Sequence, residues 1–526
     1  MFSKGNTPKN IELKIKGKKI EIQDSVKFLG VILDQRLNWK SHIEYVSNKC
    51  KRRLNLLRAV SGYKWGANKK SLLMLYRALI RPVIDYGAVA FCTAADTNLK
   101  ILERIQSQAL RLCCGASRGT ATLALQNECG EMPLRTRWLE LSIKEGTKIS
   151  TTKNHPAEQA MMDHWTLHTN KFKTDKEPLY NRTAEFNNTH THKCRGPTFQ
   201  ETPPWKNKRI QTDTTLTKTI NKKTVNPEIQ KLLTLSKIDE YNDSIRIYTD
   251  GSKFEDTTSA AVIVPEAGVR KVFRIADSSS VYAAELTAIK EAINWINTQP
   301  MHNNNKFTIF TDSLSSAQTI KSQRGTSRPT LMIELNEAIN RLETRDVTVV
   351  WIPGHVGVRG NEEADAAAKE GLNLRNVNST DYIEYSEMYS VIRKYSLQKW
   401  QKTYDDSTEG SFFKKIEPTV STKVKYADTP RGREVQITRL RLGRVITNDR
   451  LMTMKRHADG TCDRCKTPDS IQHLLLECTR KNISTRLKEN SRSLGLEHNI
   501  KNILTDRNMQ HFVANIICDI TGGKIL

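Results

Sequence analysis

Residues 241–372 alternate strand-like and helix-like segments, and acidic residues stand at the ends of several of them. Three apolar runs separated by turns predict an antiparallel meander. The later segments predict a mixed sheet with helices on its faces, which is an α/β fold. The expected strands lie at about 245–249, 260–264, 269–275, 307–311 and 347–352, and the expected helices at about 281–297, 313–321, 330–343 and from 361.

Four acids in this segment have the positions of metal ligands. Two of them follow strand-like runs, where open α/β sheets place ligand sites, and the others lie on predicted helices. The four are Asp250, Glu285, Asp312 and Asp365. Ligation by oxygen alone favours Mg²⁺ over zinc. Two such ions could activate a water and stabilise the leaving oxygen of a phosphodiester.

Several residues of this segment also have a structural explanation when taken alone. Asp312, before Ser313, could cap a helix, and Asn361 also fits an N-cap. Glu285 could be a surface acid, and His355 could be a loop histidine without a role. The ordered set of four acids is the observation that favours one metal site.

The motifs around these acids resemble the signature of type 1 ribonuclease H. They are Tyr248-Thr-Asp-Gly-Ser, Ala284-Glu-Leu, Phe310-Thr-Asp-Ser and Trp351-Ile-Pro-Gly-His-Val-Gly-Val-Arg-Gly-Asn-Glu-Glu-Ala-Asp. The resemblance implies that the four acids bind two Mg²⁺ or Mn²⁺ ions. It also implies that His355 assists proton transfer or product release and that Gly251 and Ser252 contact RNA. The expected reaction is endonucleolytic cleavage of RNA in RNA/DNA hybrids, leaving 3′-hydroxyl and 5′-phosphate ends.

Charge separates this segment from the rest of the chain. The chain has a net charge of +26, but residues 241–372 contain 14 Lys and Arg against 17 Asp and Glu, a net of −3. Basic flanks around an acidic centre suit a polyanionic partner and a cation site. The alternative is a generally basic, solvated surface. We hypothesise that the flanks supply affinity for the hybrid, because the connection 322–329 is too short for the basic helix that some ribonucleases H carry there.

A second candidate metal site lies near the C-terminus. Its residues are Cys462, Cys465, His473 and Cys478. Three thiolates and one imidazole at this spacing predict a closed structural zinc site that helps a short segment to fold. The alternative is a chance cluster of buried cysteines. With the preceding stretch 438–443, Thr-Arg-Leu-Arg-Leu-Gly, the cluster resembles the C-terminal cysteine/histidine region of non-LTR retrotransposon polyproteins.

The N-terminal region resembles another part of the same polyproteins. Phe28-Leu-Gly-Val-Ile-Leu-Asp34 is similar to the end of the reverse-transcriptase palm of Jockey- and I-like elements, and 76–87 is similar to the thumb helix. An ordinary helical domain is the alternative. The 526 residues contain no Tyr-x-Asp-Asp motif, so we predict no polymerase activity.

The predicted organisation has five parts. They are a mainly helical palm-end and thumb remnant at 1–145, a polar linker at 146–240, a ribonuclease H domain at 241–372, a helical connector at 373–430 and a basic region with the zinc site at 431–526.

Scattered cysteines and the lack of a signal pattern predict an intracellular protein, nuclear or cytoplasmic, that is neither secreted nor bound to a membrane. Two readings compete with a hydrolase of RNA/DNA hybrids: a non-catalytic nucleic-acid-binding remnant, and a truncated copy that folds poorly.

Overall fold

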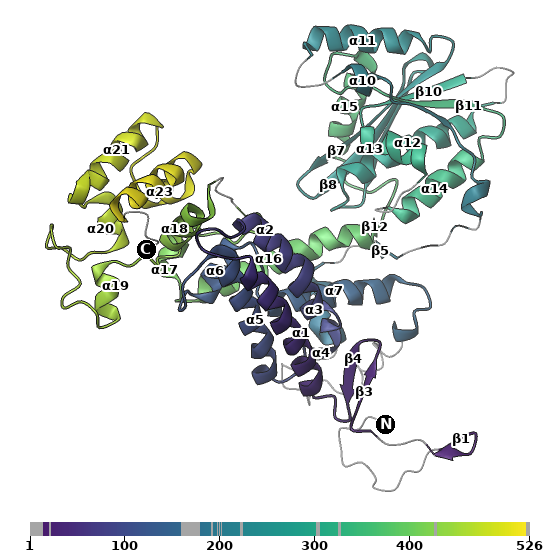
Figure 1. Ribbon diagram of the computed structural model, residues 1–526. Coiled ribbons are helices and arrows are strands. Elements are labelled where there is room, and N and C mark those ends of the chain that lie inside the picture. The colour runs from purple at the N-terminus through teal and green to yellow at the C-terminus, as the bar shows by residue number, and fades with distance from the viewer. Residues whose placement is uncertain are drawn as a thin grey trace. The chain divides into compact units, whose positions relative to one another are not determined.

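The computed structural model describes residues 14–19, 23–158, 179–190, 193–196, 198, 200, 202–220, 225–300, 306–323, 328–424 and 429–521. These residues form two compact units (Figure 1). One unit contains the described residues up to 142, residues 179–182 and the described residues from 394 onward. The other contains 143–158 and the described residues of 183–393.

A six-stranded mixed sheet is the centre of the second unit. Its strand order is β6-β11-β10-β7-β8-β9. The strands are β6 (Gln211–Asp213), β7 (Ile245–Phe254), β8 (Thr257–Val264), β9 (Val269–Ile275), β10 (Lys306–Thr311) and β11 (Asp346–Trp351). The meander β7-β8-β9 is antiparallel, whereas β10, β11 and β6 run parallel to β7. The predicted α/β architecture is confirmed.

Helices cover both faces of this sheet (Figure 1). They are α12 (Val281–Thr298), α13 (Leu314–Ser322), α14 (Pro329–Asn340) and α15 (Arg359–Gly371). The apolar stripe predicted on the first of them is buried, with Leu286, Ile289 and Ile293 fully enclosed. Tyr248 packs against Gly360 of α15, whereas Gly251 packs against α12. Because side chains alternate along a strand, these contacts place the two helices on opposite faces.

The structure differs from the predicted linker at 146–240. Its described elements are the end of α7 (Leu134–Thr151), α9 (Leu179–Thr189), β5 (Cys194–Arg195), a 3₁₀ turn (Pro204–Lys206), β6, α10 (Leu216–Thr219) and α11 (Pro227–Asp239). Residues 206–240 are here called the extension, and its described residues pack on the sheet domain: β6 pairs in register with β11, and Asn340 accepts a hydrogen bond from the Lys208 N–H. The polar composition of this segment did not predict a strand, because β6 is held by hydrogen bonds and contains no apolar run.

The predicted connector at 373–430 is divided between the units. Its first part belongs to the sheet unit, where β12 (Ile383–Glu384) pairs with β5. Glu384 accepts a hydrogen bond from the Leu331 N–H in the first turn of α14. Glu387 accepts one from the N–H of Ser280, the N-cap of α12. The connector therefore supplies caps to two helices of the sheet domain.

The other unit is mainly helical. Its N-terminal elements are β1 (Lys14–Ile15), β2 (Lys18–Lys19), β3 (Ser25–Phe28), β4 (Val31–Asp34), α1 (Lys40–Ala59), α2 (Lys69–Leu75), a π-helical turn (Tyr76–Ile80), α3 (Arg81–Asp85), α4 (Ala88–Phe91), α5 (Asp96–Cys114) and α6 (Thr122–Glu128). Its C-terminal elements are the end of α16 (Tyr385–Asp406), α17 (Ser411–Ile416), α18 (Arg431–Arg441), α19 (Asn448–Thr453), α20 (Ile471–Leu476), a 3₁₀ turn (Arg480–Asn482), α21 (Ile483–Ser493), α22 (Ile500–Thr505) and α23 (Arg507–Thr521).

A buried ion cluster joins distant parts of this helical unit. Glu128 receives Lys69 Nζ at 2.7 Å and Arg441 Nε at 3.0 Å, and each of these three side chains is at most 6% exposed. Arg441 also pairs with Glu417 at 2.8 Å. The cluster therefore ties the N-terminal helices to α18, more than 300 residues later in the chain. In the described part of the chain, no helix is both long and apolar enough to cross a membrane.

Candidate metal centres and active site

Three of the four predicted carboxylates converge on one point. Asp250 lies within β7, Glu285 lies near the start of α12, and Asp312 directly follows β10. Oxygen atoms of the three carboxylates lie within 4.8 Å of one another. Asp250 and Glu285 are buried, at 6% and 7% exposure, so Glu285 is not a surface acid.

Two glycines allow the elements of this site to approach closely. A Cβ at Gly251 would collide with the backbone nitrogen of Glu285, and a Cβ at Gly354 would collide with the carboxylate of Asp312. A larger residue at either position would displace a carboxylate of the cluster. The glycines of the sequence motifs are therefore explained by packing against the acids.

The three carboxylates have too little positive charge beside them to balance their negative charges. Burial and the neighbouring Asp312 and Asp365 together raise the pKa of Asp250 to about 7, against an opposing Gly251 N–H. Burial, Asp250 and Asp312 likewise raise the pKa of Glu285 well above its usual value. Among the described residues, Oε2 of Glu285 has no hydrogen-bond partner. Converging carboxylates with an unsatisfied buried oxygen fit hard divalent cations.

Asp365 belongs to a second group rather than to the cluster of three. Its carboxylate, an imidazole nitrogen of His355 and the carboxylate of Glu362 lie within 4.8 Å of one another. His355 Nδ1 is 4.0 Å from Asp365 Oδ2, and Lys369 Nζ is 2.7 Å from the same oxygen. Asp365 still acts electrostatically on Asp250, so the two groups are neighbours.

The loop that carries His355 has an unusual backbone. His355 has φ +60° and Gly357 has φ +77°, both in the left-handed region. That region is uncommon for residues other than glycine and occurs often at functional sites. The His355 side chain is 72% exposed, so it is accessible to a ligand above the carboxylates.

Sequence reasoning missed Glu362 and Lys369. They lie three residues before and four residues after Asp365 on α15, so helical spacing could have placed both on the same face. The N-cap alternatives are not realised: α13 begins after Ser313, and the N-cap of α15 is Val358, which puts Asn361 inside the helix. The predicted RNA contacts at Gly251 and Ser252 follow Asp250 directly on β7.

Replacement of Asp250 should stabilise the metal-free protein at high pH. The folded-state pKa of about 7 exceeds the usual aspartate value of 3.8, so the folded protein binds the proton more tightly than the unfolded protein does. Stability should therefore fall as pH rises from about 4 to 7 and stay level above that. At pH 8 in EDTA, we expect Asp250→Asn to increase the free energy of unfolding of the sheet unit by up to about 4 kcal/mol, and so to raise its melting temperature.

Calorimetry of the full chain at pH 4 and pH 8 measures this effect. The two proteins should differ little at pH 4, where Asp250 is protonated in most of the folded molecules. Glu337→Gln, at an exposed position on α14, is the control and should leave the transition unchanged. An equal melting temperature for Asp250→Asn and wild type at pH 8 would show that Asp250 is not destabilised by its neighbours.

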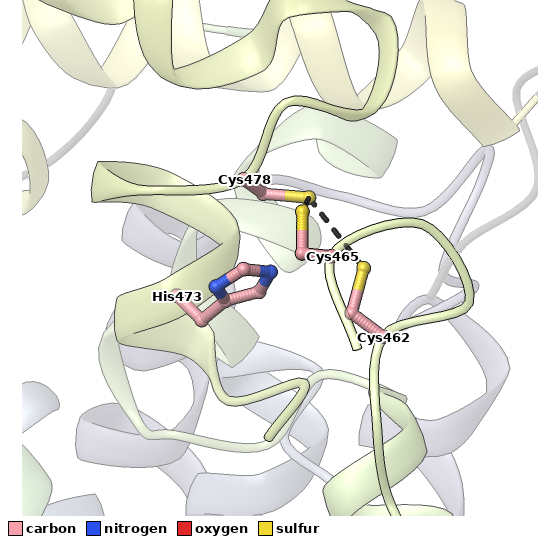
Figure 2. A group of neighbouring side chains, drawn as sticks. All are labelled: Cys462, Cys465, His473 and Cys478. Atoms are coloured by element: carbon pink, nitrogen blue, oxygen red, sulfur yellow. Dashed lines mark hydrogen bonds between the residues drawn. The ribbon is translucent and has the colours of Figure 1, made fainter. Parts of the chain in front are cut away.

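The four predicted zinc ligands point toward one another (Figure 2). Cys478 Sγ lies 3.8 Å from Cys462 Sγ and 4.0 Å from Cys465 Sγ. In a tetrahedral zinc site with Zn–S distances of ~2.3 Å, two sulfur ligands lie about 3.8 Å apart. Nε2 of His473 is buried and, among the described residues, has no hydrogen-bond partner. The spacing and the unpartnered nitrogen fit a tetrahedral zinc ion.

Surrounding groups orient these ligands. The Nδ1 atom of His473 lies 3.2 Å from the Thr467 hydroxyl, which leaves Nε2 to face the cysteines. The hydroxyl and backbone N–H of Thr479 lower the pKa of Cys465 to about 6, whereas burial raises the pKa of Cys478 to about 11. A hydrogen-bonded imidazole and thiolates stabilised by N–H groups are the usual surroundings of a structural zinc ion.

We expect the full-length protein, purified under reducing conditions, to contain about one zinc ion per chain. Cys478→Ser should lose most of the metal, because it removes one of four ligands. Cys194→Ser, at a half-buried cysteine of the other unit, should keep it. Metal analysis by mass spectrometry measures the ratio, and a wild-type value near zero would refute the zinc assignment.

Comparison with known proteins identifies the domain that carries the carboxylates. Residues 242–373 match the family model of RNase H. A Pol polyprotein from the type-1 retrotransposable element R1 4 of Nasonia vitripennis is 26% identical over 126 residues, covering 24% of this chain and 32% of the relative. The R1 polyprotein of Bradysia coprophila is 29% identical over 123 residues, covering 23% of this chain and 12% of the relative. The matches thus span a third or less of these relatives' lengths.

Proposed function

We propose that this chain, which carries an RNase H domain related to those of retrotransposon polyproteins, hydrolyses the RNA strand of RNA/DNA hybrids. The matched family and the relatives give the class of protein. The observation that carries the proposal is the convergence of Asp250, Glu285 and Asp312 within 4.8 Å. Their shortage of positive charge suits a reaction that depends on divalent metal ions.

Each residue has a role in this proposal. Asp250, Glu285, Asp312 and Asp365 would hold Mg²⁺, which when bound supplies an activated water and stabilises the leaving oxygen. His355, exposed beside Asp365, would transfer a proton or assist the product to leave. Lys369 neutralises Asp365 while no metal is held there.

The choice of the RNA strand would come from shape rather than sequence. A 2′-hydroxyl is both a donor and an acceptor, and it distinguishes RNA from DNA at a given site. Gly251 offers a backbone group and Ser252 a hydroxyl next to Asp250 on β7. We propose that these groups contact the RNA strand beside the scissile phosphate.

A cleavage assay on three duplexes of one sequence tests the proposal. The RNA/DNA hybrid should be cut in Mg²⁺ and left intact in EDTA, whereas double-stranded RNA and double-stranded DNA should be left intact in both. Equal cutting of double-stranded RNA would point to a different nuclease. The absence of hybrid cleavage would support the alternative of a non-catalytic nucleic-acid-binding protein, whose basic region and cysteine/histidine cluster would then carry the function.

A further inference from the structure

The extension, residues 206–240, adds positive charge and surface to the sheet domain. It precedes the segment that matches the RNase H family, which begins at 242. It contains eight Lys and Arg against four Asp and Glu, whereas residues 241–372 have a net charge of −3. The backbone N–H of Lys208 donates to the side chain of Asn340 at the end of α14, and its backbone carbonyl accepts from the side chain of Gln323, which follows α13. These two hydrogen bonds hold the extension against both helices.

A cavity of about 320 Å³ lies beside β6 of this extension. Its walls are rich in hydroxyl groups and lysines, and Lys321 reaches it from the end of α13. The lining residues used here are Thr212, Thr214, Thr217, Lys218, Lys321 and Asp213. The cavity is open to solvent and large enough for a phosphate group with its ester oxygens.

The one carboxylate in the wall is ionised, and its negative charge is balanced by a lysine. Asp213 pairs with Lys237 at 2.7 Å and accepts hydrogen bonds from the Tyr241 hydroxyl and from Thr215. Burial opposes its ionised form, but these partners lower the pKa of Asp213 far below its usual value. Asp213 is therefore a fixed part of the wall and is not free to bind a cation.

Two lysines and one hydroxyl of the cavity are available to bind a ligand. Within the described residues, neither Lys218 nor Lys321 forms an ion pair, and the buried Oγ1 of Thr212 has no hydrogen-bond partner. Two unpaired ammonium groups and an unsatisfied hydroxyl suit a ligand that accepts several hydrogen bonds and carries negative charge. A phosphate diester meets both requirements.

The cavity lies at a useful distance from the carboxylates. β6 is two strands away from β10, at whose end Asp312 lies, and both strands point in the same direction. At ~4.8 Å per strand, the separation across the sheet is roughly 10 Å. Thr212 is level with Ile309, three residues before Asp312, which adds roughly 10 Å along the strands and gives a distance of about 14 Å. One strand of a duplex advances about 3.4 Å per nucleotide along the axis, so this distance corresponds to about four base pairs.

We propose that the cavity beside β6 binds a backbone phosphate of the nucleic-acid substrate, through Lys218, Lys321 and the threonine hydroxyls. The proposal rests on the function proposed above and adds a contact that the extension supplies. It explains how an acidic catalytic domain grips a polyanion.

The test compares Lys218→Ala/Lys321→Ala with wild-type full-length protein. Hybrid cleavage at 50 to 200 mM salt should show a KM increased about tenfold at 150 mM and an unchanged kcat. Direct hybrid binding in EDTA, followed by fluorescence anisotropy, should lose about 2 from the slope of log K against log salt, since two cationic contacts are removed. Lys271→Ala, at an exposed lysine of β9, should leave both readouts unchanged.

The outcomes separate this proposal from the proposed function. If wild type cuts the hybrid and the double variant matches it in KM and salt slope, the phosphate site is refuted and the nuclease function stands. If wild type cuts no hybrid, the nuclease function fails. The binding slope then still decides whether the cavity contacts phosphates: a wild-type slope in the double variant refutes the site, and a reduced slope supports it.

Discussion

Asp312→Asn should reduce hybrid cleavage by at least about 10³-fold while hybrid affinity changes by less than about threefold. Metal-assisted charge stabilisation contributes several kcal/mol to such reactions, and each 1.36 kcal/mol is a factor of ten in rate. Asparagine keeps the size of the side chain beside Gly354 but removes the negative charge that a metal needs. Asp312 packs against Gly354 and lies within 4.8 Å of Asp250 and Glu285, so its carboxylate is one of the three that converge at the site.

The measurement is single-turnover cleavage of a labelled hybrid in Mg²⁺. Glu337→Gln, an exposed acid on α14 of the same domain, is the matched control and should retain the wild-type rate. A rate for Asp312→Asn within about tenfold of wild type would mean that the cluster of three carboxylates is not the catalytic centre.

Glu128→Ala should destabilise the helical unit by about 3–5 kcal/mol, because it removes the carboxylate that pairs with the buried Lys69 and leaves the buried Arg441 with Glu417 alone. Lys69 and Arg441 are 3% and 6% exposed, and both contact the Glu128 carboxylate. Burial alone would raise the pKa of Glu128, but Arg441 and Lys69 outweigh it and lower that pKa. The carboxylate is thus held ionised between its partners, and its contribution to stability should be lost as pH falls below the usual range of a glutamate.

Calorimetry of the full-length chain should show the loss in one transition, that of the helical unit. Glu103→Ala is the control, because Glu103 forms a partly exposed pair with Arg135 and such pairs contribute about 0–1 kcal/mol. An effect of Glu128→Ala no larger than that of Glu103→Ala would show that the N-terminal helices and α18 do not depend on this cluster.

The sheet domain could be predicted because its signals are local. The apolar run after Thr257 and the spacing of Leu286, Ile289 and Ile293 determine a strand and a helix without knowledge of the rest of the chain. Asp312 could be placed for the same reason, since it ends a strand-like run.

The remaining features depend on distant contacts and could not be read from the sequence. β6 is the tripeptide Gln211–Asp213, which contains no apolar residue and is a strand only because β11 lies beside it. The pairing of Glu128 with Arg441 spans 313 residues. The separation of Asp365 from the other three carboxylates depends on where α15 crosses the sheet, which no local pattern determines.

The chemistry of the product ends tests the central claim most directly. A hybrid with labelled RNA, incubated with wild-type protein, should give internal cuts that depend on Mg²⁺ and fragments with 3′-hydroxyl and 5′-phosphate ends, in agreement with attack by an activated water. Fragments with 2′,3′-cyclic phosphate ends, or cleavage that persists in EDTA, would contradict the account, because the 2′-hydroxyl rather than a metal-activated water would then be the nucleophile.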